Sequence, residues 1–441
     1  MRFYYIITQK KFFQGSAVLV VTTVLSYALG LLRDRQFAHL FGAGTALDAY
    51  NAAFIVPDLI LNIFVAGALS AAFVPLYTSL TAKNENHDAQ TLTNSVLNSS
   101  LGIVVAIGIL AWFLAPLFAH LIVPGMDAEG QQQFINLMRI LLASPIIFAI
   151  SNTLGSILVS NERFFWYGLS AALYNLGIIL GTLFLGPRIG IYGATVGALM
   201  GAVLHLTPRL ITVWSYLRYR PRIIWDQHLR SFFKLMIPRM AGHPIEQLTF
   251  LGFTSIASML GAGSIAIMNF ARNFQSMPVS VIGATLALTI FPVLSRDFAL
   301  NDHKGFRRKV NMTAGSILAV ATLAGIILFF IRRPLIAILL GGGEFGEAQI
   351  AATAATLAVF IFSIPFESLS HLLSRSFYAL HNSLTPTLVS IGALGVALGS
   401  GYFFSRTMGL PGIALGFTLG SLVKVTLLWV LLQREIRSRS L

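Results

Sequence analysis

The stretch Gly193-Ala-Thr-Val-Gly-Ala-Leu-Met-Gly201 decides the fold class, because its glycine spacing occurs again farther along the chain. The second copy is Gly412-Ile-Ala-Leu-Gly-Phe-Thr-Leu-Gly420, about 220 residues later. Pro57 and Pro278 are a proline pair at nearly the same offset, so we expect an internal duplication. Two repeated halves in an apolar chain are the design of membrane transporters whose substrate site lies between the halves.

Composition indicates a membrane protein made of helices. Hydrophobic residues make up 56% of the 441 residues and charged residues only 10%, whereas soluble domains have about 25% charged residues. A membrane-spanning helix needs about 20 mainly apolar residues. Twelve segments qualify, and none alternates as a barrel strand does: 14–32, 49–80, 96–122, 134–158, 164–186, 190–216, 232–259, 263–294, 311–331, 348–378, 384–405 and 409–433.

These spans predict an all-α polytopic membrane protein with two six-helix lobes, related by the repeat, around a central cavity. The predicted lobes are residues 1–216 and 232–441, and Pro57 is expected to bend the long second span. Residues 217–231 join the lobes and contain tyrosine, tryptophan and arginine. This composition suits an interfacial helix on the cytoplasmic leaflet.

The net charge of +14 reflects membrane topology and predicts no nucleic-acid partner. With both termini in the cytoplasm, 18 Lys and Arg residues fall in cytoplasmic segments and six in outer segments. This bias follows the positive-inside rule. The apolar run after Lys10-Lys11 has no small-residue cleavage site, so we expect the first span to stay in the mature protein.

Sequence motifs give no sign of an enzyme. The chain has no cysteine, which excludes disulfides and thiolate sites. It has no phosphate loop, no Gly-x-Ser-x-Gly elbow and no metal-ligand spacing. We therefore expect no catalytic residues, no cofactor and no metal, and transport driven by an ion gradient, the membrane potential or the substrate gradient.

Polar residues inside the predicted spans are the candidate site residues, because an ionisable group in a membrane needs a partner or a water-filled cavity. Spans two and eight, and spans four and ten, are equivalents in the repeat. A shared polar cavity explains stripes on such helices, although each stripe taken alone also fits a helix–helix seam. The stripes are Asp48, Asn51, Asp58 and Asn62; Arg239, His243 and Glu246; Asn269, Arg272, Asn273 and Ser276; and Glu367, His371 and Arg375.

One segment carries a more specific pattern: Gly30-Leu-Leu-Arg-Asp-Arg-Gln-Phe-Ala-His-Leu-Phe-Gly-Ala-Gly-Thr-Ala-Leu-Asp-Ala-Tyr50. It resembles the opening of the MurJ (MviN) lipid II flippases, within the superfamily of multidrug, oligosaccharidyl-lipid and polysaccharide exporters. Weaker matches extend over the whole chain, such as Phe54-x-x-Pro57 and Phe377-Tyr-Ala379. The resemblance implies a bacterial inner-membrane protein whose central cationic cavity alternates between the two faces.

The resemblance also implies a cargo, the undecaprenyl-diphosphate-linked disaccharide-pentapeptide that is moved outward for cell-wall synthesis. Arginine suits this cargo, because its planar fork pairs with phosphate oxygens. On this hypothesis Arg33 and Arg272 grip the diphosphate and Arg239 helps, with Asn273 and Asp58 in the cavity. Asp34 and Asp48 orient Arg33 or form an outer gate pair. The expected partners are the lipid-linked cargo, membrane lipids and cell-wall synthesis proteins.

The chain departs from the family pattern at several cavity positions. Where further essential arginines are expected it has Tyr27, Leu61 and Asn273, and Ala66 replaces a usual charged residue. Family members commonly have two more C-terminal helices than the twelve spans predicted here. These departures concern the cargo and not the fold.

Two other classes of function stay open. One is an ion-coupled drug or metabolite antiporter of the same superfamily, or an exporter of another polyprenyl-linked oligosaccharide. Carboxylate–histidine chains suit proton relays, and Glu246, His243, Glu367 and His371 are the candidates. Taken alone, the two histidines are more often structural. The other class is a membrane scaffold for the wall-synthesis machinery, which would tolerate alanine at every cavity position.

Overall fold

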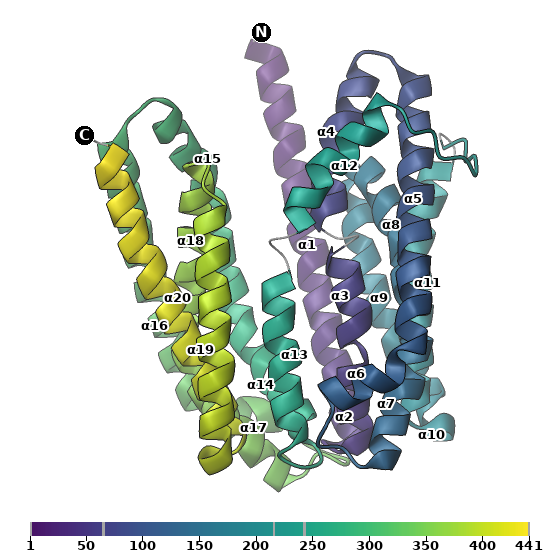
Figure 1. Cartoon of the computed structure of the whole chain (residues 1–441), viewed down its shortest axis with the longest axis vertical. Coiled ribbons are helices and arrows are strands. Elements are labelled where there is room, and N and C mark those ends of the chain that lie inside the picture. Colours follow the sequence, from purple (N-terminus) through teal and green to yellow (C-terminus); the bar gives the residue numbers. More distant parts are fainter. Residues whose placement is uncertain (1, 64–66, 215–216, 241–243, 440–441) are drawn as a thin grey trace. The chain divides into compact units, whose positions relative to one another are not determined.

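The computed structural model describes residues 2–63, 67–214, 217–240 and 244–439, and within these ranges it contains helices and no strand (Figure 1). The described residues contain nine helical segments that are long and apolar enough to cross a membrane. They coincide with nine of the twelve predicted spans, which confirms the all-α polytopic class. The count of twelve stays a prediction. The nine segments are Asn86–Phe113, Ala128–Ser160, Phe164–Phe184, Ile191–Trp214, Ser264–Ala299, His303–Leu339, Glu347–Ala379, Leu384–Met408 and Leu410–Ser438.

The helices form two compact units. Unit 1 comprises Met1–Phe41, Ala49–Val123 and Asp127–Gln247. Unit 2 comprises Gly42–Asp48, Pro124–Met126 and Leu248–Leu441. Two short segments of the first half, 42–48 and 124–126, therefore belong to unit 2.

The second predicted span is interrupted at Phe54, close to Pro57. Helix α2 ends at Ala53, four residues before Pro57. Proline has no N–H to donate to the carbonyl of residue 53, and its ring clashes with that carbonyl. The helices of this part of the chain are α1 (Arg2–Phe41), α2 (Thr45–Ala53), α3 (Ile55–Leu61), α4 (Gly67–Ala82), α5 (Asn86–Phe113), α6 (Ala115–Ile122), α7 (Ala128–Leu141), α8 (Ala143–Ser160), α9 (Phe164–Phe184), α10 (Gly186–Ile189), α11 (Ile191–Trp214) and α12 (Gln227–Met240).

Helix α12 packs on unit 1 through one apolar face. Leu229, Phe232 and Met236 recur at helical spacing and lie in one buried cluster with Phe73 of α4 and Leu92 of α5. The residues before it, 217–226, are not helical. The prediction of an interfacial helix over 217–231 is therefore wrong for this first part, and the helix begins only at Gln227.

The start of α12 has a local cause. Asp226 Oδ1 accepts a hydrogen bond from Leu229 N at 2.8 Å, which is the geometry of a helix N-cap. Upstream, Pro221 cannot donate to a helical hydrogen bond. The backbone of residues 217–226 instead bonds to side chains of α5, as described below.

Unit 2 has its own apolar core, in which Phe306 of α16, Phe377 of α18 and Leu428 of α20 are buried together. A π-helical stretch follows Pro278 and separates α14 from α15. The helices of this part are α13 (Pro244–Ser258), α14 (Ser264–Pro278), the π-helix η2 (Val279–Ala284), α15 (Thr285–Ala299), α16 (His303–Leu339), α17 (Glu347–Phe360), the 3₁₀-helix η3 (Ile361–Ser363), α18 (Ile364–Ala379), α19 (Leu384–Met408) and α20 (Leu410–Arg439).

The repeated glycines pack one pair of helices closely in each unit. In unit 1, a Cβ on Gly181 of α9 would lie 2.2 Å from Gly197 Cα of α11. In unit 2, a Cβ on Gly416 of α20 would lie 2.4 Å from Gly401 Cα of α19, and Figure 1 shows these two helices side by side. Membrane helices approach this closely only through small residues. The glycines thus serve equivalent helix pairs, as a duplication predicts.

We expect Gly416→Ala to destabilise the protein by about 1–3 kcal/mol, because the added methyl forces α19 and α20 apart. Gly399→Ala is a matched control on α19, since it adds the same methyl where no atom lies within 4 Å. Thermal unfolding of both purified variants in detergent measures the difference. Equal melting temperatures for Gly416→Ala and the parent protein would contradict the close packing.

Candidate functional site

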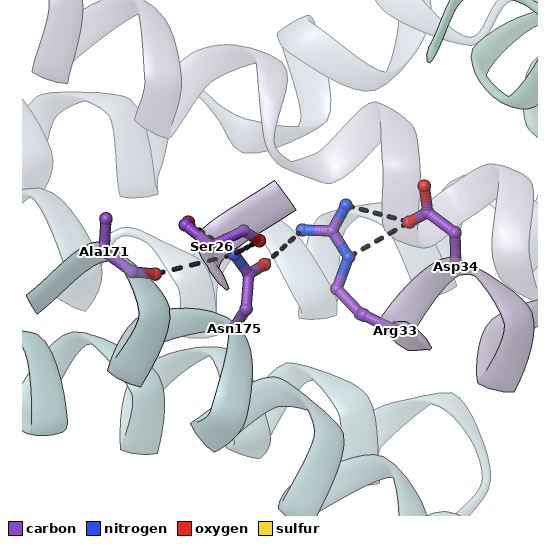
Figure 2. Close-up of polar contacts among 5 residues, drawn as sticks. All are labelled: Ser26, Arg33, Asp34, Ala171 and Asn175. Atoms are coloured by element: carbon purple, nitrogen blue, oxygen red, sulfur yellow. Dashed lines mark hydrogen bonds and ion pairs between the residues drawn. The ribbon is translucent and has the colours of Figure 1, made fainter. Parts of the chain in front are cut away.

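A polar cluster around Arg33 lies within unit 1 and joins α1 to α9 (Figure 2). Arg33 Nε and Nη2 donate to Asp34 Oδ1 at 3.1 and 2.8 Å. Arg33 Nη1 donates to Asn175 Oδ1 at 3.1 Å. Asn175 Nδ2 in turn donates to the carbonyl and hydroxyl oxygens of Ser26, both at 3.2 Å. The guanidinium is therefore held among the helices and does not extend along the protein surface.

Arg33 keeps hydrogen-bonding capacity for a ligand. Its side chain is 26% exposed, and the three bonds above use three of the five N–H groups of a guanidinium. The other two N–H groups have no acceptor in the part of the chain that the structure describes. An anion with several oxygens fits this arrangement, because arginine binds phosphate through two parallel N–H···O bonds.

Three further residues of unit 1 surround this ion pair. Tyr50 of α2 and Tyr174 of α9 interact electrostatically with Arg33 and with Asp58 of α3. The Tyr50 ring is almost fully buried and packs edge-on against Phe37, with ring centroids 5.2 Å apart. Asp58 is half-buried.

Tyr50, Tyr174 and Asn175 are absent from the residues that the sequence singled out. Tyr50 ends the opening pattern of residues 30–50 but carries no charge. Tyr174 and Asn175 are adjacent polar residues in the middle of the predicted span 164–186, and this pair was the available signal.

Asp48 lies in unit 2 and caps the first turn of α14. Its Oδ2 accepts from Gly263 N, and its Oδ1 accepts from Ala266 N, both at 2.7 Å. The first N–H groups of a helix have no partner within the helix and form its positive end, which favours a carboxylate. Asp48 is only 1% exposed. Both of its oxygens are engaged with α14, so Asp34 is the acid that the structure places against Arg33.

Other bonds hold the two short segments of unit 2. Gln349 Nε2 donates to Ala43 O at 3.2 Å, and Gly125 N donates to Ser258 Oγ at 3.1 Å. Gly263 adopts a φ of 87°, the left-handed region that favours glycine, directly before α14. Helix ends of unit 2 thus fix residues 42–48 and 124–126 by several independent contacts.

The polar residues predicted on α14 and α18 lie in unit 2. The Arg272 guanidinium carbon lies 3.0 Å from the centre of the Phe250 ring, a cation–π contact. Asn273 beside it is exposed. Glu367 Oε1 accepts a hydrogen bond from Ser421 Oγ of α20 at 3.0 Å, and His371 follows one turn later on α18.

The third predicted stripe is described only in part. Glu246 is exposed in the first turn of α13. His243 lies outside the described residues, and so does the side chain of Arg239, although its backbone belongs to α12. Their sharing of one helical face stays a prediction. Within the described ranges, no group of three or more His, Cys, Asp or Glu side chains could hold a metal ion.

Arg209 is a second buried arginine of unit 1, and it is only 3% exposed. Its Nε donates to Ser170 Oγ at 3.1 Å, and its Nη1 donates to Ser151 O and Asn152 Oδ1, both at 3.0 Å. Its Nη2 donates to Tyr167 O at 3.3 Å. These neutral acceptors come from α8 and α9 and occupy four of the five N–H groups, so Arg209 ties three helices together.

A family model described as lipid II flippase MurJ matches residues 37–440. The chain belongs to the MurJ lipid II flippase family. A probable lipid II flippase MurJ from Aquifex aeolicus (strain VF5) is 26% identical over 414 residues, which cover 93% of this chain and 81% of that protein. The resemblance inferred from residues 30–50 is therefore confirmed, and the relatives are transporters rather than enzymes.

Solved structures agree with this family. A lipid II flippase MurJ in an inward closed conformation is 26% identical, with a TM-score of 0.81, over 96% of this chain and 90% of that one. An inward-facing multidrug transporter of the MATE family reaches a TM-score of 0.80 at 15% identity, over 94% of each chain. The second likeness shows a shared fold alone.

The MurJ match begins at Phe37, so it does not include Arg33 and Asp34. Arg33 and Asp34 are candidate site residues because of the contacts that Figure 2 shows. Two of the positions where the family pattern led us to expect arginine carry exposed neutral side chains, Tyr27 and Asn273, and the third carries the half-buried Leu61.

Proposed function

We propose that this chain is a flippase for lipid-linked precursors that moves lipid II from the inner to the outer leaflet by alternating access. The observation that carries the proposal is the MurJ family match over residues 37–440. The relatives from Aquifex aeolicus and Thermotoga maritima bear the name probable lipid II flippase MurJ. The Arg33 cluster supplies chemistry that suits the diphosphate of such a cargo.

Arg33 is the proposed first contact of the diphosphate. Asp34 balances its charge when the site is empty, and phosphate oxygens replace Asp34 when cargo enters. Asn175 keeps the guanidinium in place during this exchange, which lowers the cost of ordering it. The planar fork then binds the phosphate through two charge-assisted hydrogen bonds.

Further residues complete the proposed cavity. Arg272 and Arg239 add positive charge, Asn273 adds a neutral hydrogen-bonding group, and Asp58 offsets Arg33 when cargo is absent. Asp48 acts as a gate residue, because its bonds to the first turn of α14 must break for residues 42–48 to leave that helix. Residues 1–216 and 232–441 form the two moving lobes, and 217–231 link them.

The proposed setting is the bacterial cytoplasmic membrane, with both termini in the cytoplasm. The distribution of Lys and Arg supports this topology, with 18 in cytoplasmic segments and six in outer segments. The proposed partners are the lipid-linked cargo, membrane lipids and proteins of cell-wall synthesis.

Proton-coupled export of drugs is the second candidate function. The MATE-like fold and the neutral residues at Tyr27, Leu61 and Asn273 favour it. Glu367, with Ser421 as its hydrogen-bond partner, is the described carboxylate best placed to carry a proton in unit 2.

Complementation separates the two candidates. The chain is expressed in bacteria whose own lipid II flippase is depleted, and lipid II on the outer leaflet is labelled. We expect restored growth and restored labelling, with unchanged tolerance to a panel of cationic drugs. Raised drug tolerance without lipid II labelling, in cells that insert the protein, would reject the flippase proposal in favour of the antiporter.

A further inference from the structure

Residues 217–226 are fixed to α5 through their backbone. Asn94 donates Nδ2 to Arg218 O at 3.1 Å and accepts from Arg220 N at 3.0 Å. Asn98 Nδ2 donates to Arg220 O at 3.0 Å and to Arg222 O at 3.1 Å. The carbonyl groups of all three arginines therefore point at α5, and the backbone between them has a defined position.

Two further bonds strengthen this attachment, and one of them extends it to Ile224. Ser95 Oγ accepts from Ile224 N at 3.0 Å, and Tyr219 OH donates to Asn98 Oδ1 at 2.9 Å. Within the segment, Arg222 N donates to Arg220 O at 2.8 Å across Pro221. Residues 217–226 are thus ordered without being a helix.

The arginine side chains of this segment are exposed. Those of Arg218, Arg220 and Arg222 have no hydrogen bond or ion pair with any described residue, and the nearby acid, Asp226, caps α12 instead. Arg230 and Lys234 follow on α12, one turn apart and exposed. We call these five cations the basic strip.

Exposed apolar side chains lie within the same segment. Ile223, Ile224 and Trp225 are 54%, 48% and 59% exposed, and Tyr219 is 50% exposed. None of the four belongs to the buried cluster of unit 1, and the Trp225 ring stacks on Phe233 of α12 with ring centroids 5.5 Å apart. Tryptophan and tyrosine concentrate where a membrane meets water. The attachment on α5 lies at such a boundary, since the uninterrupted apolar part of α5 begins after Ser100.

We propose that the basic strip is a docking surface for the headgroups of acidic phospholipids. Each guanidinium can pair with a phosphodiester, and the neighbouring apolar side chains can enter the interface beside it. The bonds from Asn94, Ser95 and Asn98 hold the arginines in place before a lipid arrives, which lowers the entropy cost of binding. On this proposal the basic strip binds lipids of the surrounding membrane, and this binding does not depend on the identity of the transported cargo.

Native mass spectrometry of the detergent-purified full chain tests the proposal. Phosphatidylglycerol and phosphatidylcholine are titrated in parallel, and the ratio of their affinities gives the preference for acidic lipid. The triple variant Arg218→Gln/Arg220→Gln/Arg222→Gln should lose at least about tenfold of this preference, since each cation near an acidic membrane contributes severalfold. The variant Asn94→Ala/Asn98→Ala keeps every charge, so it should lose less of the preference for acidic lipid than the arginine triple variant does.

The control variant is Lys304→Gln/Arg307→Gln/Arg308→Gln, which removes three exposed cations from α16 of unit 2. It should keep the preference of the parent protein. An unchanged preference in the arginine triple variant, or an equal loss in the control, would overturn the proposal. The proposal would also be overturned if the arginine triple variant lost binding to undecaprenyl diphosphate and kept its preference for phosphatidylglycerol, because the basic strip would then bind cargo. An unchanged preference in Asn94→Ala/Asn98→Ala would overturn the role of α5.

Discussion

Arg33→Lys is expected to lose most transport of lipid-linked cargo, although it keeps the positive charge. Lysine has a compact ammonium in place of the fork and cannot bond Asp34 and Asn175 while presenting two parallel donors to phosphate. Loss of a charge-assisted hydrogen bond costs about 1.5–3 kcal/mol, so transport should fall roughly 10- to 100-fold. Arg33→Ala should remove essentially all transport. Complementation of a flippase-depleted strain, with membrane levels of each variant, measures both.

Arg35→Lys is the matched control, because it makes the same exchange two residues along α1 at an exposed side chain. It should support growth as the parent protein does. The alternative role for Arg33 is a side chain that reaches the lipid headgroups, for which lysine serves equally well. Full activity of Arg33→Ala would remove Arg33 from the site and weaken the proposed binding of the diphosphate.

Asp48→Ala is expected to reduce both stability and transport. The substitution leaves the N–H groups of Gly263 and Ala266 without their carboxylate in a buried position. An unpartnered buried polar group costs about 1–3 kcal/mol, and the loss of a helix cap costs about 0.5–2 kcal/mol. Asp48→Asn keeps one acceptor oxygen, so its stability and transport should lie between those of Asp48→Ala and the parent protein. Thermal unfolding and complementation measure the two effects.

Asp302→Ala is the control for Asp48. Asp302 Oδ1 accepts from Gly305 N at 2.8 Å and caps α16, but the residue is exposed. Water can replace this cap, so a smaller loss of stability and normal transport are expected. Wild-type stability and growth in Asp48→Ala would show that the cap of α14 serves neither folding nor function.

Local patterns in the sequence were sufficient for the class of protein and for several details of the helices. Apolar length predicts the spans, because a helix must satisfy its own backbone in lipid. Pro57 explains the end of α2 at Ala53, since its effect acts on the carbonyl four residues back. The repeated glycines predict tightly packed helix pairs, and the opening pattern up to Tyr50 predicts the family.

The partners of the site residues are pairs distant in sequence, and nothing local reveals them. Asn175 binds Arg33 across 142 positions, and Asp48 binds Gly263 across 215. The hypothesis from the resemblance has Asp34 and Asp48 orient Arg33 or form a gate pair, and in the structure both oxygens of Asp48 bind the first turn of α14. Residues 217–226 are a similar case, because an interfacial helix and an ordered non-helical segment have the same composition, and the deciding bonds come from α5.

Reconstitution of the purified chain into vesicles that contain fluorescent lipid II tests the flippase proposal most directly. A membrane-impermeant quencher reports the lipid II in the outer leaflet under imposed membrane potentials and ion gradients. The proposal predicts that lipid II moves between leaflets far faster with the parent protein than in protein-free vesicles or in vesicles that contain Arg33→Ala. Fluorescent phosphatidylcholine should stay in its leaflet. Lipid II movement no faster than in protein-free vesicles, or equally fast with Arg33→Ala, would contradict it.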